Sequence, residues 1–310
     1  MAELPPLRPT EARHPLSAGL QARDGQTVLA QLLDAQMAAL VCLRPALPAI
    51  EAVAERAARV LQAGGKLAYA GAGSSGLMAL ADALELAGTF GIPPERTPVL
   101  FAGGAAALLH MTGGVEDDPR LAQADLARAG LQAGDMVLCL TASGSTPYTL
   151  EVARLARAAG VVVAGFANVP GAALFAQSDL SVLLETGPEL VSGSTRLGAA
   201  SAQKVALNLV SVRLGLLLGH VHDGYMVNVV ADNAKLMDRA ARIVAALSGQ
   251  GMDAARHALA QAGGAVKPAV LIAAGAGPAE AARILTESAG VLGPALAALG
   301  QEKGHSKHGS

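Results

Sequence analysis

The sequence has no tryptophan, and aromatic residues make up 2% of it. It also has two cysteines in 310 residues, too few for a disulfide-stapled secreted scaffold. Both Cys42 and Cys139 lie in apolar runs, so we expect them to be buried, reduced thiols of a cytosolic protein rather than nucleophiles.

Charge of either sign is scarce as well. The net charge is -2 and 15% of residues are charged, so we expect neither nucleic acid nor an anionic membrane as a partner. Residues 1–6 show no basic segment followed by an apolar one, which predicts no signal peptide. Two uncharged stretches, 97–115 and 158–178, are broken by glycine, proline or polar residues, and we therefore predict a cytoplasmic protein without a membrane span.

Short apolar runs that end in small or polar residues are abundant. They alternate with helical patterns, and continuous Val/Leu/Ala runs separated by helices are typical of a parallel sheet covered on both faces. With right-handed crossovers, this pattern predicts an α/β fold, a three-layer α/β/α sandwich with a five-stranded parallel sheet. The predicted strands are 66–70, 98–102, 136–141, 161–167 and 180–185.

The rest of the chain divides by composition. Residues 1–23 are proline-rich and predict an arm over the surface, followed by a sheet domain with flanking helices over 24–247. Long helices are expected at 196–218 and at about 225–246. Residues 248–299 predict a small all-helical domain, and 300–310 a disordered polar tail.

The first predicted strand runs into a glycine-rich corner, Gly71–Gly76, which a segment of helical composition follows. Such a turn lets backbone N–H groups approach an anion, and the helix N-terminus adds partial positive charge. Ser74 and Ser75 stand at the helix start, where they can cap the helix or bind phosphate. A plain strand-to-helix turn with a serine cap remains the alternative.

The corner lacks the partners of two familiar nucleotide motifs. No acidic ribose ligand follows the second strand, which ends in Gly103-Gly104. Leu77 follows Gly76, so the lysine of a phosphate-binding loop is missing too.

A second corner follows the strand 136–141 and is rich in hydroxyl groups. It contains Thr141, Ser143, Ser145 and Thr146. Ligands of open α/β sheets bind beyond the carboxyl ends of the strands, and both corners are at such ends. We therefore expect the two corners to meet around one ligand.

The second corner resembles the S-x-S-G-x-T loop of the sugar isomerase (SIS) domain, a phosphosugar-binding fold. An ordered set of further motifs resembles N-acetylmuramic acid 6-phosphate etherases, from Thr10 to about Leu299. The C-terminal helical region is similar to that family's small ubiquitin-associated-like domain. The motifs are Gly71–Gly76, Asp82–Glu85, Thr89–Gly91, Ala102–Gly104, Glu116–Asp118, Ala142–Tyr148, Gly187–Glu189, Ser192–Arg196, Ala202–Lys204 and Asn233–Leu236.

The resemblance implies a homodimeric carbon–oxygen lyase that cleaves the lactyl ether of a sugar 6-phosphate by elimination and hydration, without a metal or redox cofactor. It implies that Glu85 is the catalytic acid, and its apolar neighbours Leu84 and Leu86 would raise its pKa by desolvation. Apolar helix faces at 28–41 and 205–218 are candidate dimer surfaces, or else ordinary core. The implied sugar-phosphate ligands are Ser74, Ser75, Thr141, Ser143, Ser145, Thr146, Glu189, Ser192 and Ser194.

The chain departs from the family in its charged pocket positions. The family's base, a glutamate three positions before the Glu-Asp pair, is Gly113 here. Two usual arginines are Leu77 and Ser145, and a usual lysine is Gly198. These changes indicate either a different substrate or catalysis that has been lost or rerouted.

Glu116 and His110 are the candidate replacement bases. Two other functions stay open: a non-catalytic phosphosugar-binding regulator, and an aldose–ketose phosphosugar isomerase that uses Glu189 or Glu116 to move a proton. His220 and His222 are two residues apart without clustered cysteines or carboxylates, so no metal site is predicted.

Overall fold

The computed structural model describes residues 9–111, 113–231 and 233–306, with side chains as far as 301. Residues 1–8 of the expected arm and 307–310 of the expected tail lie outside the described residues. The chain divides into two compact units. The sheet unit is Met1–Leu84 with Pro94–Arg213, and the helical unit is Glu85–Pro93 with Leu214–Ser310.

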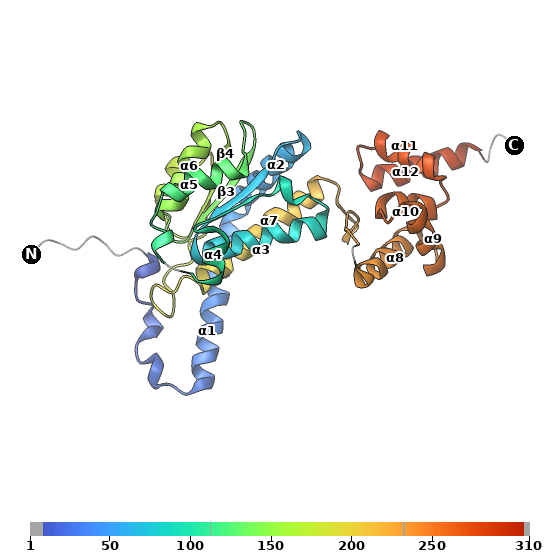
Figure 1. The fold of residues 1–310 in the computed structure, drawn as a ribbon. Coiled ribbons are helices and arrows are strands. Elements are labelled where there is room, and N and C mark those ends of the chain that lie inside the picture. Colours follow the sequence, from blue (N-terminus) through green and yellow to red (C-terminus); the bar gives the residue numbers. More distant parts are fainter. Residues whose placement is uncertain (1–8, 112, 232, 307–310) are drawn as a thin grey trace, which may run out of the picture. The chain divides into compact units, whose positions relative to one another are not determined.

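A five-stranded parallel sheet forms the centre of the sheet unit, and its strand order is β2-β1-β3-β4-β5 (Figure 1). β1 and β3 are neighbours, with Gly71 opposite Leu140 at their carboxyl ends. The sheet confirms the prediction from the apolar runs. Its strands are β1 (Leu67–Gly71), β2 (Val99–Phe101), β3 (Met136–Thr141), β4 (Val162–Ala167) and β5 (Leu180–Leu183).

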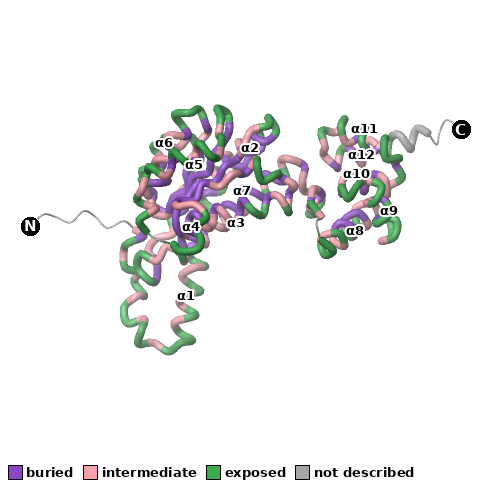
Figure 2. Tube along the Cα trace, in the orientation of Figure 1, coloured by how far each residue is buried: buried purple, intermediate pink, exposed green. Residues whose placement is uncertain are grey.

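Helices cover both faces of this sheet, which is the buried centre in Figure 2. On one face Ala70 and Cys139 pack in a core with Val152 of α6. On the other, the Tyr69 hydroxyl donates a 3.0 Å hydrogen bond to Asp82 of α3. The first face carries α5 (Arg120–Ala129) and α6 (Pro147–Ala158), and the second carries α2 (Leu43–Gln62), α3 (Gly73–Phe90) and α7 (Gly198–Leu217).

Helix α1 (Gly25–Ala39) begins at Asp24, whose carboxylate accepts a 3.0 Å hydrogen bond from the Thr27 N–H. The arm runs back beside it, and Arg23 hydrogen-bonds Gln31 (Figure 1). The shorter elements of this unit are η1 (Pro9–Glu11), η2 (Pro15–Ser17), η3 (Leu20–Ala22), η4 (Leu40–Cys42), η5 (Pro94–Arg96), α4 (Gly104–Leu109), η6 (Gly113–Val115) and η7 (Ala173–Gln177).

In the described part of the helical unit a short hairpin precedes five helices that share one apolar core. Because α8 contributes Val244 to this core, it packs with the helices that follow it. The domain boundary expected at residue 248 stays a prediction. Helix α8 lies before that residue, although it packs with the helices after it. The elements are β6 (Val221–His222), β7 (Tyr225–Met226), α8 (Ala234–Ser248), α9 (Met252–Gln261), α10 (Val266–Ala273), α11 (Pro278–Glu287) and α12 (Leu292–Ser306).

Two expectations for this part of the chain are wrong. The helix expected from about 225 begins at Ala234, where Asn233 accepts a 3.0 Å hydrogen bond from the Leu236 N–H. A hairpin precedes it, because Asp223 and Gly224 have φ of 47° and 76°, as a two-residue turn with both central φ positive requires. Residues 301–306 were expected to be disordered, but they continue α12.

One helical stretch among the described residues, Gly25–Gln62, is long and apolar enough to cross a membrane by length and composition. A third (33%) of its most apolar window is buried inside the protein. The helices of soluble cores pass the same test. The expected absence of a membrane span therefore stays a prediction.

Candidate functional site

The second corner, Thr141–Thr146, gathers hydroxyl groups directly after β3. The Thr141 Oγ1 lies 2.7 Å from the Thr146 Oγ1 and 3.3 Å from the Ser143 Oγ, which in turn is 3.3 Å from the Ser145 Oγ. Gly144 holds the loop in a φ of +71°, and a side chain there would begin 2.3 Å from the Ala172 Cβ. The four predicted hydroxyls are thus brought together by a glycine turn that tolerates no larger residue.

The first corner joins β1 to α3 through close backbone packing. Helix α3 begins at Gly73, so Ser74 and Ser75 lie in its first turn, where backbone N–H groups lack intrahelical partners. A Cβ on Gly71 would lie 2.9 Å from the Gly76 N, and one on Gly76 would lie 2.7 Å from the Phe101 ring. Neither serine hydroxyl bonds another described residue, and Ser75 is the more buried of the two.

Glu116 connects the two corners. Its carbonyl oxygen accepts a 3.1 Å hydrogen bond from the Tyr148 N–H, in the first turn of α6 after the second corner. Its carboxylate lies against the first corner, because a Cβ on Gly73 would be 2.4 Å from the Glu116 Oε1. Together with the pairing of β1 and β3, this places the two corners side by side, as the sequence predicted.

The surroundings of Glu116 favour its neutral form. Burial raises the pKa of the Glu116 carboxyl above its ordinary value of 4.5, and the neighbouring Asp117 charge raises it further. A glutamate whose pKa is raised is a stronger base, once ionised, than a glutamate with an ordinary pKa. Glu116 is therefore suited to proton abstraction beside the first corner.

The other candidate base, His110, and the Gly113 position both face solvent. The His110 side chain is exposed at the end of α4, and Gly113 is exposed in η6. A Cβ on Gly113 would meet nothing within 4 Å. The position that the resemblance assigns to the family's base therefore leaves space for a Cβ.

Glu85 is exposed on α3, and Leu84 beside it has 67% of its surface exposed. Leu86, in contrast, is buried. The expectation that two apolar neighbours would desolvate Glu85 is wrong within this chain, because the helix turns Leu84 and Glu85 outward together.

Glu189 is buried and caps α7. Its two carboxylate oxygens accept hydrogen bonds from the N–H groups of Gly198 at 3.0 Å and Ala199 at 2.9 Å. Such a contact neutralises orphan donors of the first helical turn. Glu189 is thus positioned by α7, and a contact with sugar would have to share these oxygens.

Ser192 and Ser194 lie in the loop before α7, which the N-terminal arm contacts. The Ser192 hydroxyl donates to the carbonyl oxygen of Glu11 at 2.9 Å, and the Ser194 hydroxyl bonds no other described residue. Gly193 donates its N–H to the Thr10 carbonyl oxygen at 3.3 Å. The arm therefore fixes the position of this loop, and the Ser194 hydroxyl can still bond a ligand.

Asp82, which begins one of the motifs shared with the family, joins three elements. Its buried carboxylate accepts hydrogen bonds from Tyr69 of β1, and from Asn208 and Ser211 of α7 at 3.0 Å each. Lys204 donates to the Asn208 Oδ1 at 3.0 Å and extends this network. A lone aspartate in an apolar helix was the available signal, since a buried carboxylate needs donors.

The two cysteines carry no thiolate at neutral pH. Burial raises the pKa of Cys139 to about 12 and that of the half-buried Cys42 to about 11. The described residues also contain no group of three or more His, Cys, Asp or Glu side chains arranged to hold a metal ion.

Comparisons with known proteins identify the family of this chain. The SIS domain model matches residues 43–168. The chain is 44% identical over 284 residues to the N-acetylmuramic acid 6-phosphate etherase of Deinococcus radiodurans, covering 91% of this chain and 93% of that protein. It is 39% identical to the enzyme of the same name from Serratia proteamaculans, covering 93% and 97%.

Solved structures share the fold of the sheet unit. A Bacteroides fragilis protein assigned as a phosphosugar isomerase involved in capsule formation matches with a TM-score of 0.50 and 21% identity. The match covers 65% of this chain and 95% of that one, and identity this low speaks for the fold alone. The curated relatives carry the stronger conclusion: by its identity to them over most of its length, this chain belongs to the N-acetylmuramic acid 6-phosphate etherase family.

Proposed function

We propose that this protein is a carbon–oxygen lyase that cleaves the lactyl ether of N-acetylmuramic acid 6-phosphate or a closely related amino-sugar 6-phosphate. The observation that carries the proposal is the convergence of two hydroxyl-lined corners on one half-buried carboxylate, Glu116. The names of the curated relatives support the substrate class.

The phosphate binds at the two corners. Each hydroxyl of the second corner lies within 3.3 Å of at least one other, and Ser74 and Ser75 add hydroxyls at the start of α3. Hydroxyl and backbone N–H donors suit a phosphate dianion because charge-assisted hydrogen bonds are strong and need no buried countercharge. The family usually has arginine at the position of Ser145, so this chain brings less positive charge to the phosphate.

The reaction proceeds by elimination and then hydration. The open-chain C1 aldehyde acidifies the C2 proton, which Glu116 removes; a C2–C3 double bond forms as the C3–O bond breaks. Glu85 gives the departing lactate its proton, a role that rests on the resemblance. Water then adds across the double bond, with its hydroxyl at C3 and a proton at C2, which leaves the 3-hydroxy sugar 6-phosphate. Two side chains that differ in protonation are required for these steps.

A phosphosugar-binding regulator without turnover is the second candidate, because Gly113 and Leu77 remove charged groups from the pocket. Lactate release from N-acetylmuramic acid 6-phosphate separates the two functions. We expect wild-type protein to release lactate, and both Glu85→Gln and Glu116→Gln to reduce kcat by about 10²–10⁴. Tight binding of the sugar phosphate without lactate, at any enzyme concentration, would support the regulator instead.

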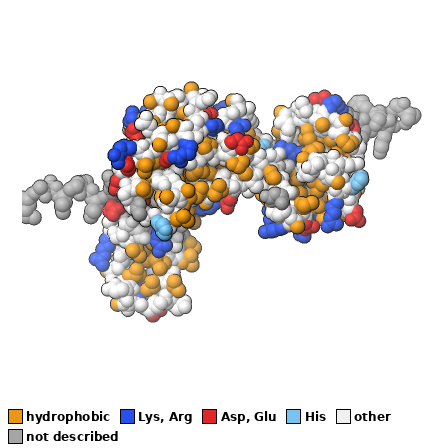
Figure 3. Space-filling view, viewed as in Figure 1, with side chains coloured by type: hydrophobic (Ala, Val, Ile, Leu, Met, Phe, Trp, Pro, Cys, Tyr) orange, Lys and Arg blue, Asp and Glu red, His pale blue; other side chains and the backbone are white. Residues whose placement is uncertain are grey.

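We infer that the chain acts as a cytoplasmic homodimer. Helix α1 and the turn η4 that follows it carry an exposed apolar stripe of Leu29, Leu33, Met37 and Val41, spaced four residues apart. The space-filling view shows this apolar surface over α1 (Figure 3). Exposed apolar patches of this kind mark interfaces in proteins that fold in water.

A further inference from the structure

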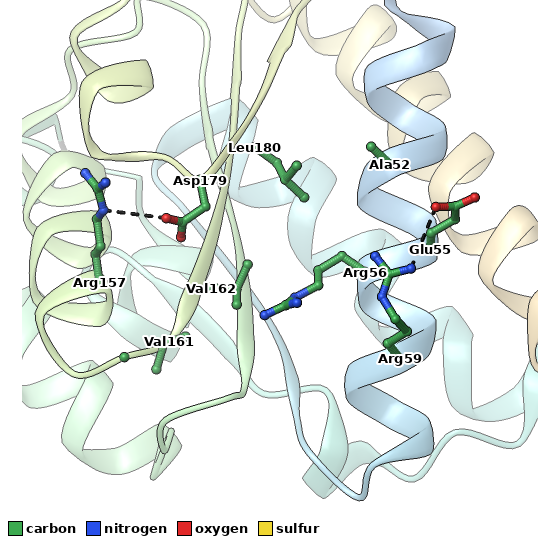
Figure 4. Close-up of a pocket in the computed structure, with 10 residues that line it drawn as sticks. Ala52, Glu55, Arg56, Arg59, Arg157, Val161, Val162, Asp179 and Leu180 are labelled. Carbon is green, nitrogen blue, oxygen red and sulfur yellow. Dashed lines mark ion pairs between the residues drawn. The ribbon is translucent and has the colours of Figure 1, made fainter.

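A second cavity lies at the opposite end of the sheet from the two corners. Its volume is about 490 Å³, and it lies where β4 and β5 begin, between α2 and the end of α6 (Figure 4). Parallel sheets bind their usual ligands at the carboxyl ends of the strands, so this cavity is separate from the phosphosugar site. Cavities of about 300–1,000 Å³ are the size that holds small ligands. We call it the α2–β4 cavity.

Three guanidinium groups line the α2–β4 cavity. Arg59 pairs with Glu55 at 3.8 Å, and Arg157 pairs with Asp179 at 3.6 Å. All four side chains are at least 40% exposed, and exposed pairs contribute little to stability. Arg59 and Arg157 also stand in the last turns of α2 and α6, where positive charge suits the helix dipole.

Neither an ion pair nor a place in the last turn of a helix explains the presence of Arg56. Its Nε is buried and finds no hydrogen-bond partner, and its guanidinium pairs with no carboxylate among the described residues. Figure 4 shows the side chain extending from α2 across the cavity toward Val162, at the start of β4. A partly buried, unpaired charge is costly, so an anion is the missing partner.

We propose that the α2–β4 cavity binds a phosphate monoester of a small hydroxylated molecule. Arg56 holds the phosphate, since a guanidinium fork matches phosphate oxygens in a bidentate way. Arg59 turns toward the same group from its weak exposed pair, and Arg157 reaches it with N–H groups that neither Asp179 nor the Ala176 carbonyl oxygen engages. Glu55 and Asp179 then accept hydrogen bonds from the ligand's hydroxyl groups, and Val161 and Leu180 cover its apolar side.

Calorimetric titration of the full chain with glucose 6-phosphate tests the proposal. We expect two binding events per chain for the wild type, one for Arg56→Gln, and one for the double variant Ser143→Ala, Thr146→Ala. Arg44→Gln, an exposed position on the same helix outside the cavity, keeps both events. Arg56→Lys, which keeps the charge but loses the fork, weakens the second event about tenfold.

The melting temperatures of the ligand-free variants serve as a control for the titration. Without ligand, Arg56→Gln melts at or above the wild-type temperature, because it removes an unpaired charge. Arg157→Gln, at an exposed position on the other wall, weakens the same binding event without touching Arg56. The proposal is overturned if Arg56→Gln keeps two events, or if it lowers the ligand-free melting temperature. Lactate release is measured separately, and its loss or retention concerns only the etherase site.

Discussion

Gly113 leaves space for the first atom of a larger side chain. A Cβ there meets nothing within 4 Å, and its φ is not in the left-handed region. Gly113→Glu should therefore place a second carboxylate beside Glu116 without disturbing the loop. We expect kcat for lactate release to rise by about tenfold or more, given that a positioned base contributes about 10²–10⁴.

Gly114→Glu is the matched control, because Gly114 is equally exposed and its Cβ also meets nothing within 4 Å. It adds the same charge one residue away. Equal gains in the two variants would show that charge alone, and not the position of the base, changes the rate.

Glu116 should determine how the reaction rate changes as the pH is lowered. As a base it must be ionised, and burial holds its pKa above 4.5, so kcat/KM should fall on acidification with a midpoint above that value. Asp117 raises the pKa of Glu116 through its charge, so Asp117→Asn should move the midpoint to lower pH. A pH profile of both proteins measures this. A midpoint that moves upward, or not at all, would separate Glu116 from the proton transfer.

At the scale of elements, Asp82 ties β1, α3 and α7 together. Asp82→Ala leaves three donors without their acceptor, and we expect it to lower the free energy of unfolding by about 3–5 kcal/mol in urea titrations. Ser211→Ala removes one of these bonds and should cost about 1 kcal/mol. If the two variants lose equal stability, the aspartate is not the centre of the network.

The sequence predicted the elements whose signals are local. Five apolar runs predicted the five strands, and small residues at their ends predicted both corners. The hairpin at 221–226 was missed because its strands have two residues each, although Asp223-Gly224 is a hairpin signal. The sequence did not predict that Glu85 is exposed. Its apolar neighbours, Leu84 and Leu86, do not by themselves show which face of the helix is buried.

Features that depend on distant segments were beyond the sequence. Glu116 was a candidate base, but its contacts with Gly73 and Tyr148 come from loops that only the sheet brings together. Arg56 gave no signal either, since its cavity is completed by residues 157–180.

For the whole molecule, the apolar stripe of α1 predicts self-association. Leu33→Glu places a charge in the middle of the stripe, where 59% of the Leu33 surface is exposed, so the folded chain itself should tolerate it. We expect the variant to become monomeric in light scattering coupled to size-exclusion chromatography. Gln26→Glu adds the same charge at an exposed polar position of α1 and should remain dimeric. A wild-type monomer at micromolar concentration would refute the prediction.

The pairing of Gly71 with Leu140 has a consequence for the order in which parts of the protein form during folding. The phosphate-binding corners follow strands that are far apart along the chain, and β2, which lies between them in sequence, pairs with the other edge of β1. Closing so long a loop is slow compared with coiling a helix. During refolding, circular dichroism should therefore recover first, and capture of a sugar phosphate should appear as a late, separate phase.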